Sequence, residues 1–277
     1  MAQHNIAHFY GMIQRDPTVT KDQQGNVTSA SVYIATARSS RVFDDRNNNN
    51  MVEFDQVMLF SAYPPMAEQM SKTRTNDIVI IKGTVNTRNT PKIITCENCG
   101  NRFFVTGDGM DENPRNTGMI TFVTPIELDI RDTGLTSEEA QAMLVAHREM
   151  SNEVLLVGRL CSDPRQWEGG NATAYQLGIN RKFYVRDDDP STHADFPYIR
   201  SYGKQAYADF DSLKKGSLVL VDGLVCMRRF LRSSRCPHCG QQKEWKDKVL
   251  EVVPYTVEYL DGYRTPQERQ QGDEIGD

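Results

Sequence analysis

Apolar and polar residues alternate along most of this chain, as they do in β-strands that bury one face. Val32 and Ile34 share one face of a predicted strand, and Tyr33 and Ala35 share the other. Two further segments are apolar at every position and predict strands buried on both faces: residues 78–81 and 218–221. Short strands separated by turn residues predict a mainly β protein that folds as a barrel or a sandwich.

One segment, residues 132–151, has the pattern of a helix instead. Thr136 or Ser137 can cap its start, and two glutamates follow at the end where the helix dipole favours negative charge. A single stripe then recurs at helical spacing: Ala140, Met143, Leu144 and His147. We expect a short helical linker here.

The segments on either side of this helix repeat each other. Residues 11–17 match 158–164, residues 30–38 match 173–181, and residues 83–88 match 223–228. The separation falls in steps from 147 to 143 to 140, as loop-length differences between two copies of one domain would produce. We therefore predict a first domain over 1–131, the linker over 132–151, a second domain over 152–262 and a disordered acidic tail over 263–277.

Each copy carries a CxxCG motif, Cys96–Gly100 in the first and Cys236–Gly240 in the second. Two thiolates on a tight turn supply half of a tetrahedral zinc site, and two such motifs supply all four ligands. We predict one structural Zn²⁺ ion bound by four cysteines, within the chain or between subunits: Cys96, Cys99, Cys236 and Cys239. A redox pair would need a thioredoxin-like helix that the pattern lacks, and unliganded thiols are the other alternative.

Charge and composition narrow the function classes. A net charge of −5 and a pI near 5.6 do not indicate nucleic-acid binding by themselves. Single-strand binders nevertheless rely on stacking and need cations only along their groove. The motifs of nucleotide hydrolases, zinc proteases and serine hydrolases are absent, so we expect no enzyme.

The sequence also bears on location. The N-terminal residues have neither the basic nor the apolar region of a signal peptide, and no 18 apolar residues run together. We expect a cytoplasmic protein, in which the six cysteines are reduced or bound to metal.

The second copy resembles bacterial single-stranded DNA-binding proteins, segment by segment and in order. Its first strand signature is Gly158-Arg159-Leu160 with Asp163-Pro164, and the later strands match at 176–181, 198–204, 213–223 and 249–260. The first copy is more divergent, and its membership rests on the repeat. The resemblance implies two tandem OB-fold β-barrels, as in the duplicated branch of the family. Members of that branch dimerise to present four barrels; a pseudo-dimeric monomer is the alternative.

The resemblance also implies which residues bind. In the family an aromatic residue precedes the Gly-Lys of the third strand, and Tyr202 and Lys204 occupy these positions. Phe60 is the expected counterpart of Tyr202 in the first copy, if the alignment slips by two residues. Aromatic rings interleaved with arginines complete the predicted contacts: Arg38, Arg41, Phe43, Trp167, Arg181, Phe183, Tyr184, Arg228 and Phe230.

We therefore expect binding and protection of single-stranded DNA, without strong sequence preference, in replication, recombination, repair or the transfer of mobile DNA, with DNA-metabolism proteins as further partners. Two alternatives remain at this point. OB-fold barrels also bind proteins, which would make this a zinc-stabilised scaffold. Single-stranded RNA is the other alternative, because no residue here identifies a reader of the 2′-hydroxyl.

Overall fold

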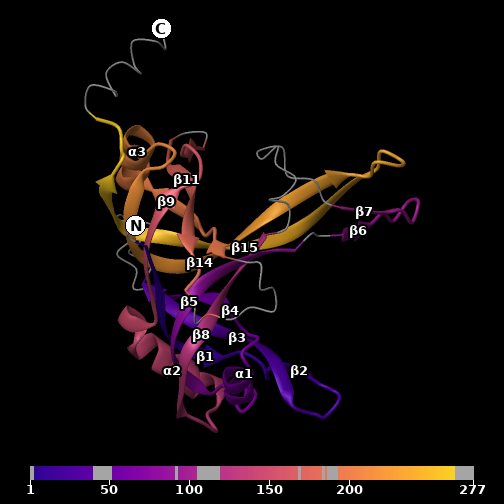
Figure 1. Ribbon diagram of the computed structural model, residues 1–277. Helices are drawn as coiled ribbons and strands as arrows, with labels where there is room; N and C mark the ends of the chain where they lie inside the picture. The colour runs from indigo at the N-terminus through magenta and orange to yellow at the C-terminus, as the bar shows by residue number, and fades with distance from the viewer. Residues whose placement is uncertain are drawn as a thin grey trace.

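Strands dominate the computed structural model, which describes residues 3–39, 52–90, 93–104, 119–167, 170–182, 185 and 193–265 (Figure 1). The predicted mainly β class is confirmed. The tail from residue 266 onward lies outside the described residues.

The first copy contains six strands that matter for its barrel and edge: β1 (His4–Ile13), β2 (Thr18–Lys21), β3 (Val27–Ser39), β4 (Val52–Ser61), β5 (Ile78–Asn89) and β8 (Met119–Asp132). It also contains helix α1 (Pro64–Met70) and a separate small hairpin, β6 (Ile93–Thr95) with β7 (Arg102–Phe104). Helix α2 (Ser137–Ala146) and the short 3₁₀ helix η3 (Arg148–Met150) follow, and Thr136 caps α2 through a reciprocal pair of hydrogen bonds with Glu139.

The second copy repeats this order with strands β9 (Asn152–Leu160), β10 (Arg165–Gln166), β11 (Ala172–Asn180), β12 (Ala194–Asp195), β13 (Tyr198–Tyr202), β14 (Leu218–Arg235) and β15 (Gln242–Asp261). Helix α3 (Gly203–Ser212) lies between β13 and β14. Among the described residues, no helix combines the length and apolar character of a membrane span.

Each copy closes into a five-stranded barrel. In the first barrel the order is β1-β3-β4-β8-β5 and back to β1, and the second barrel repeats it as β9-β11-β13-β15-β14. All neighbours are antiparallel except one pair in each barrel, which meets at Leu59 and Val123 in the first and at Ile199 and Val252 in the second. This Greek-key closure is the OB fold, so the predicted fold is confirmed.

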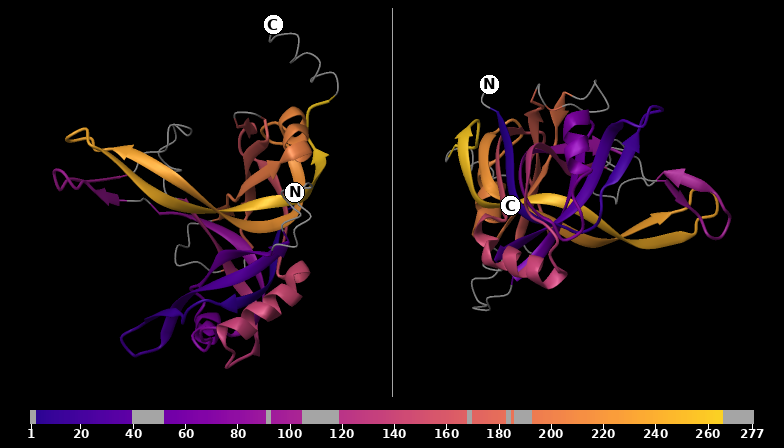
Figure 2. Two further views of the ribbon diagram at one scale, coloured as in Figure 1. Left: turned by 180° about the vertical axis from the view of Figure 1, so that it is seen from behind. Right: turned by 90° about the horizontal axis from the view of Figure 1, so that it is seen from below.

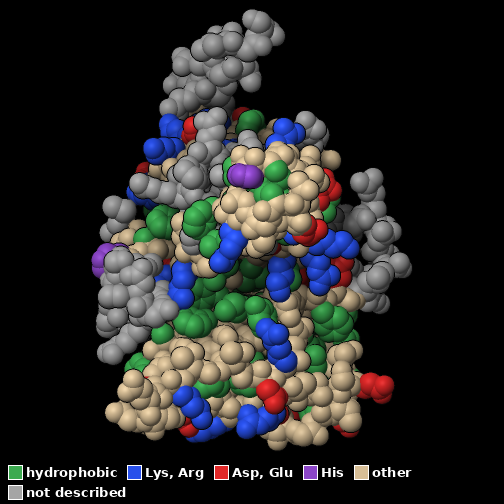
Figure 3. Space-filling model, turned by 90° about the vertical axis from the view of Figure 1, so that its right-hand side faces the viewer, with side chains coloured by type: hydrophobic (Ala, Val, Ile, Leu, Met, Phe, Trp, Pro, Cys, Tyr) green, Lys and Arg blue, Asp and Glu red, His purple; other side chains and the backbone are tan. Residues whose placement is uncertain are grey.

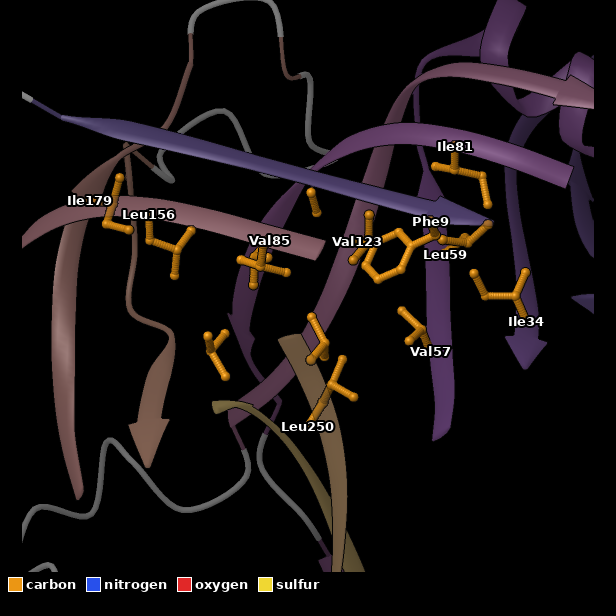
Figure 4. Close-up of a cluster of buried hydrophobic side chains, with 14 of the residues drawn as sticks. Phe9, Ile34, Val57, Leu59, Ile81, Val85, Val123, Leu156, Ile179 and Leu250 are labelled. Carbon is orange, nitrogen blue, oxygen red and sulfur yellow. The ribbon is translucent and has the colours of Figure 1, made fainter. Parts of the chain in front are cut away.

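The alternation seen in the sequence becomes the inside and outside of the first barrel. Val32 and Ile34 point into a core in which Phe9 and Leu59 also lie (Figure 4). On the other face of β3, Ala35 is covered by the apolar stripe of α2. Helix α2 therefore packs on the outside of the barrel and leaves its closure unchanged.

Glycine recurs in the repeat because backbones approach closely there. In both hairpins that end a barrel, the register shifts at a glycine, Gly83 opposite Pro125 and Gly223 opposite Pro254. A Cβ atom at Gly83 would lie 2.6 Å from the carbonyl oxygen of Thr124, and one at Gly223 would overlap the carbonyl of Val253. These bulges bend the strands enough to close the barrel.

The two barrels are joined through their first strands, because β1 and β9 pair antiparallel from His4↔Val157 to Phe9↔Asn152. The pairing is symmetric. Asn5 and Asn152 are equivalent residues, and the two residues paired with them are equivalent to each other. Ala7 and Val154, which are also equivalent, pair at its centre. A local twofold axis therefore relates the barrels within one chain.

Both asparagines make the same contact. The Asn5 amide donates to the carbonyl of Val85 at 2.7 Å and accepts from its N–H at 2.8 Å. Asn152 makes the same pair of hydrogen bonds with Val225, at 2.7 and 2.9 Å. Two buried side-chain amides thus satisfy strand groups at matching places in the two barrels.

Each barrel extends an arm toward one side of the molecule (Figure 2). The second-copy arm is the outer part of β14 and β15, residues 226–251, paired up to the turn after Arg235. The first-copy arm comprises residues 86–90 and 93–104, with the β6–β7 hairpin at its tip. Figure 1 shows the two tips side by side.

Candidate nucleic-acid interface and four-cysteine cluster

The tips of the two arms bring four cysteines together within one chain. The sulfur atoms of Cys96 and Cys239 are 3.6 Å apart, those of Cys99 and Cys236 are 3.7 Å apart, and all four lie within 4.8 Å of one another. None forms a disulfide. Four thiol donors at this spacing fit a metal ion.

The two knuckles share one backbone geometry. In each, the first cysteine donates its N–H to the residue five positions on, and the glycine donates back to the first cysteine, at 2.9 Å in all four bonds. The cluster rests on a small apolar core that contains Ile94, Phe103 and, at its edge, Trp245. An ion pair between Lys243 and Glu97, at 2.7 Å, also joins the tips.

The surroundings shift the pKa values of the four-cysteine cluster in different directions. Donation from the backbone N–H of Gln241 and from Asn98 lowers the pKa of Cys239 to about 6, and backbone donors also lower the pKa of Cys236. Asn101 donates to Cys99, but burial and the neighbouring thiols outweigh it and raise the pKa of Cys99 to about 12. The turns thus stabilise some thiolates while the four sulfurs oppose full ionisation in the absence of a counter-charge.

Near the barrels the arms are locked by two equivalent ion pairs. Asp195 in the second barrel binds Arg181 at 3.0 Å and accepts the N–H of Thr87 in the first-copy arm at 2.8 Å. Asp55 in the first barrel binds Arg38 at 2.6 Å and accepts the N–H of Met227 in the second-copy arm at 3.0 Å. Each arm is therefore anchored on the opposite barrel.

Both locks are shielded from water. The Arg181 and Asp195 side chains are 4% and 1% exposed, and those of Arg38 and Asp55 are 11% and 5% exposed. We assign Arg38 and Arg181 a structural role and leave them out of the proposed binding surface, because their guanidinium groups are committed to these carboxylates.

A row of alternating rings and guanidinium groups crosses the outside of the second barrel. The guanidinium of Arg200 lies 4.6 Å from the ring of Trp167, and that of Arg228 lies 4.7 Å from the ring of Phe230. Glu251, which is 3% exposed, holds both arginines at 3.1 Å. We call these five residues the second-barrel ladder.

Tyr202 borders this ladder at the end of β13. It is half-buried, and burial together with the charge of Glu251 raises the pKa of its hydroxyl. Lys204 is exposed in the first turn of α3, two residues on. Four of the predicted contact residues therefore lie close together on the second copy: Trp167, Tyr202, Arg228 and Phe230.

The first barrel uses the same positions with different chemistry. Leu59 and Ile199 occupy equivalent parallel pairs, which places Phe60 with Arg200 and Ala62 with Tyr202. The expected slip that would pair Phe60 with Tyr202 does not occur. By the same register, Arg88 corresponds to Arg228 and Phe122 corresponds to Glu251.

An aromatic pair thus replaces the ionic group. Phe60 and Phe122 meet edge to face with centroids 5.6 Å apart, and Arg88 lies 4.9 Å from Phe60 and 5.5 Å from Phe122. We call these three residues the first-barrel cluster. Both barrels therefore carry rings and guanidinium groups on equivalent strands, although in the first barrel Phe122 is buried and only Phe60 and Arg88 are partly exposed.

Comparison with known proteins agrees with this arrangement. The Single-strand binding protein family matches residues 151–238. Single-stranded DNA-binding protein 1 of Staphylococcus aureus strain MSSA476 is 32% identical over 124 residues, which are 44% of this chain and 72% of that protein. The single-stranded DNA-binding protein of Bacillus cereus is 40% identical over 115 residues, 40% of this chain and 61% of that protein.

The chain belongs to the single-strand binding protein family.

Among solved structures, the wild-type single-stranded DNA-binding protein of Thermus aquaticus has a TM-score of 0.53 at 15% identity and covers 96% of both chains. A deletion mutant of that protein gives 0.55 at 16% identity, covering 96% of this chain and 98% of that one. This likeness in fold covers both copies, including the first, which the family model does not match.

Four of the predicted contact residues lie outside the described residues: Arg41, Phe43, Phe183 and Tyr184. Sequence reasoning missed four residues of the two faces: Arg88, Phe122, Arg200 and Glu251. Arg88 carried a usable signal, because the repeat aligns it with Arg228. Glu251 carried none, since a single carboxylate in a strand resembles an exposed polar residue.

Replacing Asp195 with alanine should lower the free energy of unfolding by about 3–5 kcal/mol, because it leaves the buried Arg181 charge without its partner. It also leaves the N–H of Thr87 unsatisfied. Denaturant unfolding followed by circular dichroism measures the change. Asp129→Ala, which removes the exposed pair with Arg131, is the control and should change stability by about 0.5 kcal/mol or less. Equal effects of the two substitutions would contradict the lock.

Proposed function

We propose that this protein binds single-stranded DNA without strong sequence preference and protects it in replication, recombination, repair or the transfer of mobile DNA. The observation that carries the proposal is the second-barrel ladder, together with its aromatic counterpart on the first barrel. Membership of the single-strand binding protein family supports it.

The chemistry of the ladder suits unpaired nucleotides. Every base has a π-face, so stacking on Trp167 or Phe230 tolerates any sequence. Arg228, whose side chain is 31% exposed, can attract a phosphate, while the more buried Arg200 positions Trp167. Glu251 neutralises part of the charge of Arg200 and Arg228 and fixes both side chains beside the rings. The surface is therefore rigid before the strand arrives, which lowers the entropic cost of binding.

The distribution of charge removes the objection raised by the net charge of −5. Figure 3 views the molecule from the side to which the arms extend, and it shows hydrophobic side chains gathered in a hollow at mid-height. Lysine and arginine side chains surround that hollow in the same view. Positive charge is thus gathered around an apolar hollow, an arrangement that suits a single-strand binder.

Titration with fluorescent oligo-dT at moderate salt tests the proposal. Trp167→Ala and Tyr202→Ala should each raise the Kd by about 5- to 150-fold, as the absence of stacking with one base predicts. A duplex of equal length should bind far more weakly than the single strand.

Tyr255→Ala is the matched control, because this exposed ring lies near Glu149, Asp222 and Glu153 rather than near arginines on the ladder. Its affinity should equal that of the wild type. Equal affinity of the wild type for duplex and single strand would refute single-strand binding, and a preference for oligo-rU would indicate an RNA binder.

We also propose that the four cysteines bind one structural Zn²⁺ ion. Sulfurs at about 2.3 Å from a tetrahedral zinc ion lie about 3.8 Å from one another, and two of the pairs here are 3.6 and 3.7 Å apart. The ion would supply the counter-charge that four thiolates need, and it would fasten the first-copy arm to the second-copy arm. Its role is structural because all four positions are filled by protein.

Protein purified without chelator should contain one zinc ion per chain by elemental mass spectrometry. The Cys96→Ser/Cys239→Ser variant should contain none, and it should keep the circular dichroism of the wild type because the cluster lies at the arm tips, away from both barrel cores. Cys161→Ser, outside the cluster, should retain the metal. Wild-type protein without zinc would refute this assignment.

A homodimer with four barrels completes the proposal, on the strength of the resemblance to the duplicated branch of the family. One chain already holds two barrels in a fixed arrangement through β1 and β9. Two such chains would present four barrels, so light scattering should give about twice the chain mass of 31.5 kDa. A mass of one chain would instead identify a pseudo-dimeric monomer.

A cytoplasmic location is also part of the proposal. None of the six cysteines forms a disulfide, which suits a reducing compartment.

A further inference from the structure

A pocket of about 470 Å³ lies where the second-copy arm crosses the outside of the first barrel. Arg15 and Tyr33 of the first copy line it, and Lys248 of β15 reaches it from the second copy. It belongs neither to the second-barrel ladder nor to the first-barrel cluster. Its walls come from both copies, so neither barrel alone could form it.

The centre of the pocket is the ring of Tyr33. The guanidinium of Arg15 lies 4.6 Å from its centroid and the ammonium of Lys248 lies 5.0 Å from it. Tyr33 pairs with Met58 across β3 and β4, and Phe60 follows two residues further along β4 on the same outward face. The pocket and the first-barrel cluster therefore share the outward side of β4.

The lining is positively charged in an acidic protein. It contains two cations and no carboxylate, although the chain carries a net charge of −5. The neighbouring acid, Asp16, is turned toward Thr75 and accepts both its N–H and its hydroxyl. Within the described part of the chain, neither Arg15 nor Lys248 forms an ion pair, so both cations can neutralise an anion.

Amide side chains place Lys248 and add hydrogen-bonding groups. The ammonium of Lys248 donates to Gln56 at 3.0 Å, and Gln56 donates to Gln14. Asn76, held in the left-handed conformation at φ 71°, completes this side of the wall. A ring, two cations and several amides are the groups that recognise a nucleotide: a stacking surface, a phosphate site and partners for a base edge.

The local twofold axis supplies an internal comparison. The same crossing occurs on the other side of the molecule, where Gln176 corresponds to Tyr33 and Met119 corresponds to Lys248, and these two residues are in contact at 3.8 Å. Ser162 stands there in place of Arg15. The fold thus needs neither the ring nor the cations at a crossing, and only one crossing has them.

We propose that this pocket binds one nucleotide of the DNA strand, with its phosphate between Arg15 and Lys248 and its base against Tyr33. The inference rests on the proposed function and names the place where the strand passes from the second-copy arm to the first barrel. Since the equivalent crossing lacks these groups, the strand crosses between the barrels on one side of the molecule only.

The decisive variant is Arg15→Ser/Tyr33→Gln/Lys248→Met, which installs the residues that the chain itself uses at the equivalent crossing. Titrations with a long oligo-dT at several salt concentrations should show affinity reduced about tenfold or more. The slope of log K against log salt should become shallower by about 0.7 for each phosphate that the variant no longer neutralises. Circular dichroism confirms that the variant is folded.

Lys72→Met/Arg131→Ser changes the net charge equally at exposed positions and should bind with the affinity and salt slope of the wild type. If both variants behave alike while wild-type protein binds single strands, the pocket assignment is wrong and the proposed function stands. If wild-type protein shows no preference for single strands, the proposed function fails.

A second measurement uses the wild-type protein alone. Irradiation of a complex with oligo-dT that contains 5-iododeoxyuridine should crosslink the peptide that includes Tyr33. Crosslinks confined to the peptides of Trp167, Tyr202 and Phe230 would show that the strand bypasses the pocket and would overturn the proposal.

Discussion

The antiparallel pairing of β1 with β9 is the interaction on which the rest of the structure depends. It joins the two barrels through equivalent strands, and Ala7 opposite Val154 marks the centre of the resulting twofold arrangement. The hydrogen-bond register of this strand pair fixes the separation and the relative direction of the two barrels. It therefore determines where the other elements of one copy contact the other copy. Matching hydrogen bonds from Asn5 to Val85 and from Asn152 to Val225 hold both strands in their barrels.

The arms follow from that arrangement. With the barrels back to back, the hairpin that leaves each barrel must pass over its neighbour, and Asp55 and Asp195 accept its backbone as it passes. The two arms then run to the same side, and the four cysteines at their tips meet. Charge pairs near the barrels anchor each arm on the opposite barrel, and an ion pair and a small apolar core join the arms at their tips.

The duplicated barrels preserve backbone geometry and diverge in chemistry. At three equivalent positions the second barrel has Arg200, Glu251 and Arg228, while the first has Phe60, Phe122 and Arg88. In the second barrel Glu251 fixes two arginines beside the rings, whereas in the first barrel a single arginine packs on two rings, of which Phe122 is buried. The two faces therefore differ in chemistry, and the crossing beside Tyr33 is basic while the equivalent crossing beside Gln176 is not.

The sequence by itself determined the β class, the duplication and the identity of the cysteine motifs, because alternation, repeated segments and CxxCG spacing are local and survive as patterns. It also pointed to Trp167, Tyr202 and Phe230 as candidates. Only the tertiary structure decided that Arg181 is buried against Asp195, that Phe60 corresponds to Arg200 rather than Tyr202, and that Lys248 reaches Tyr33. The reason is physical: the role of a charged or aromatic side chain depends on strand register and on contacts between residues far apart in the chain, which no local pattern encodes.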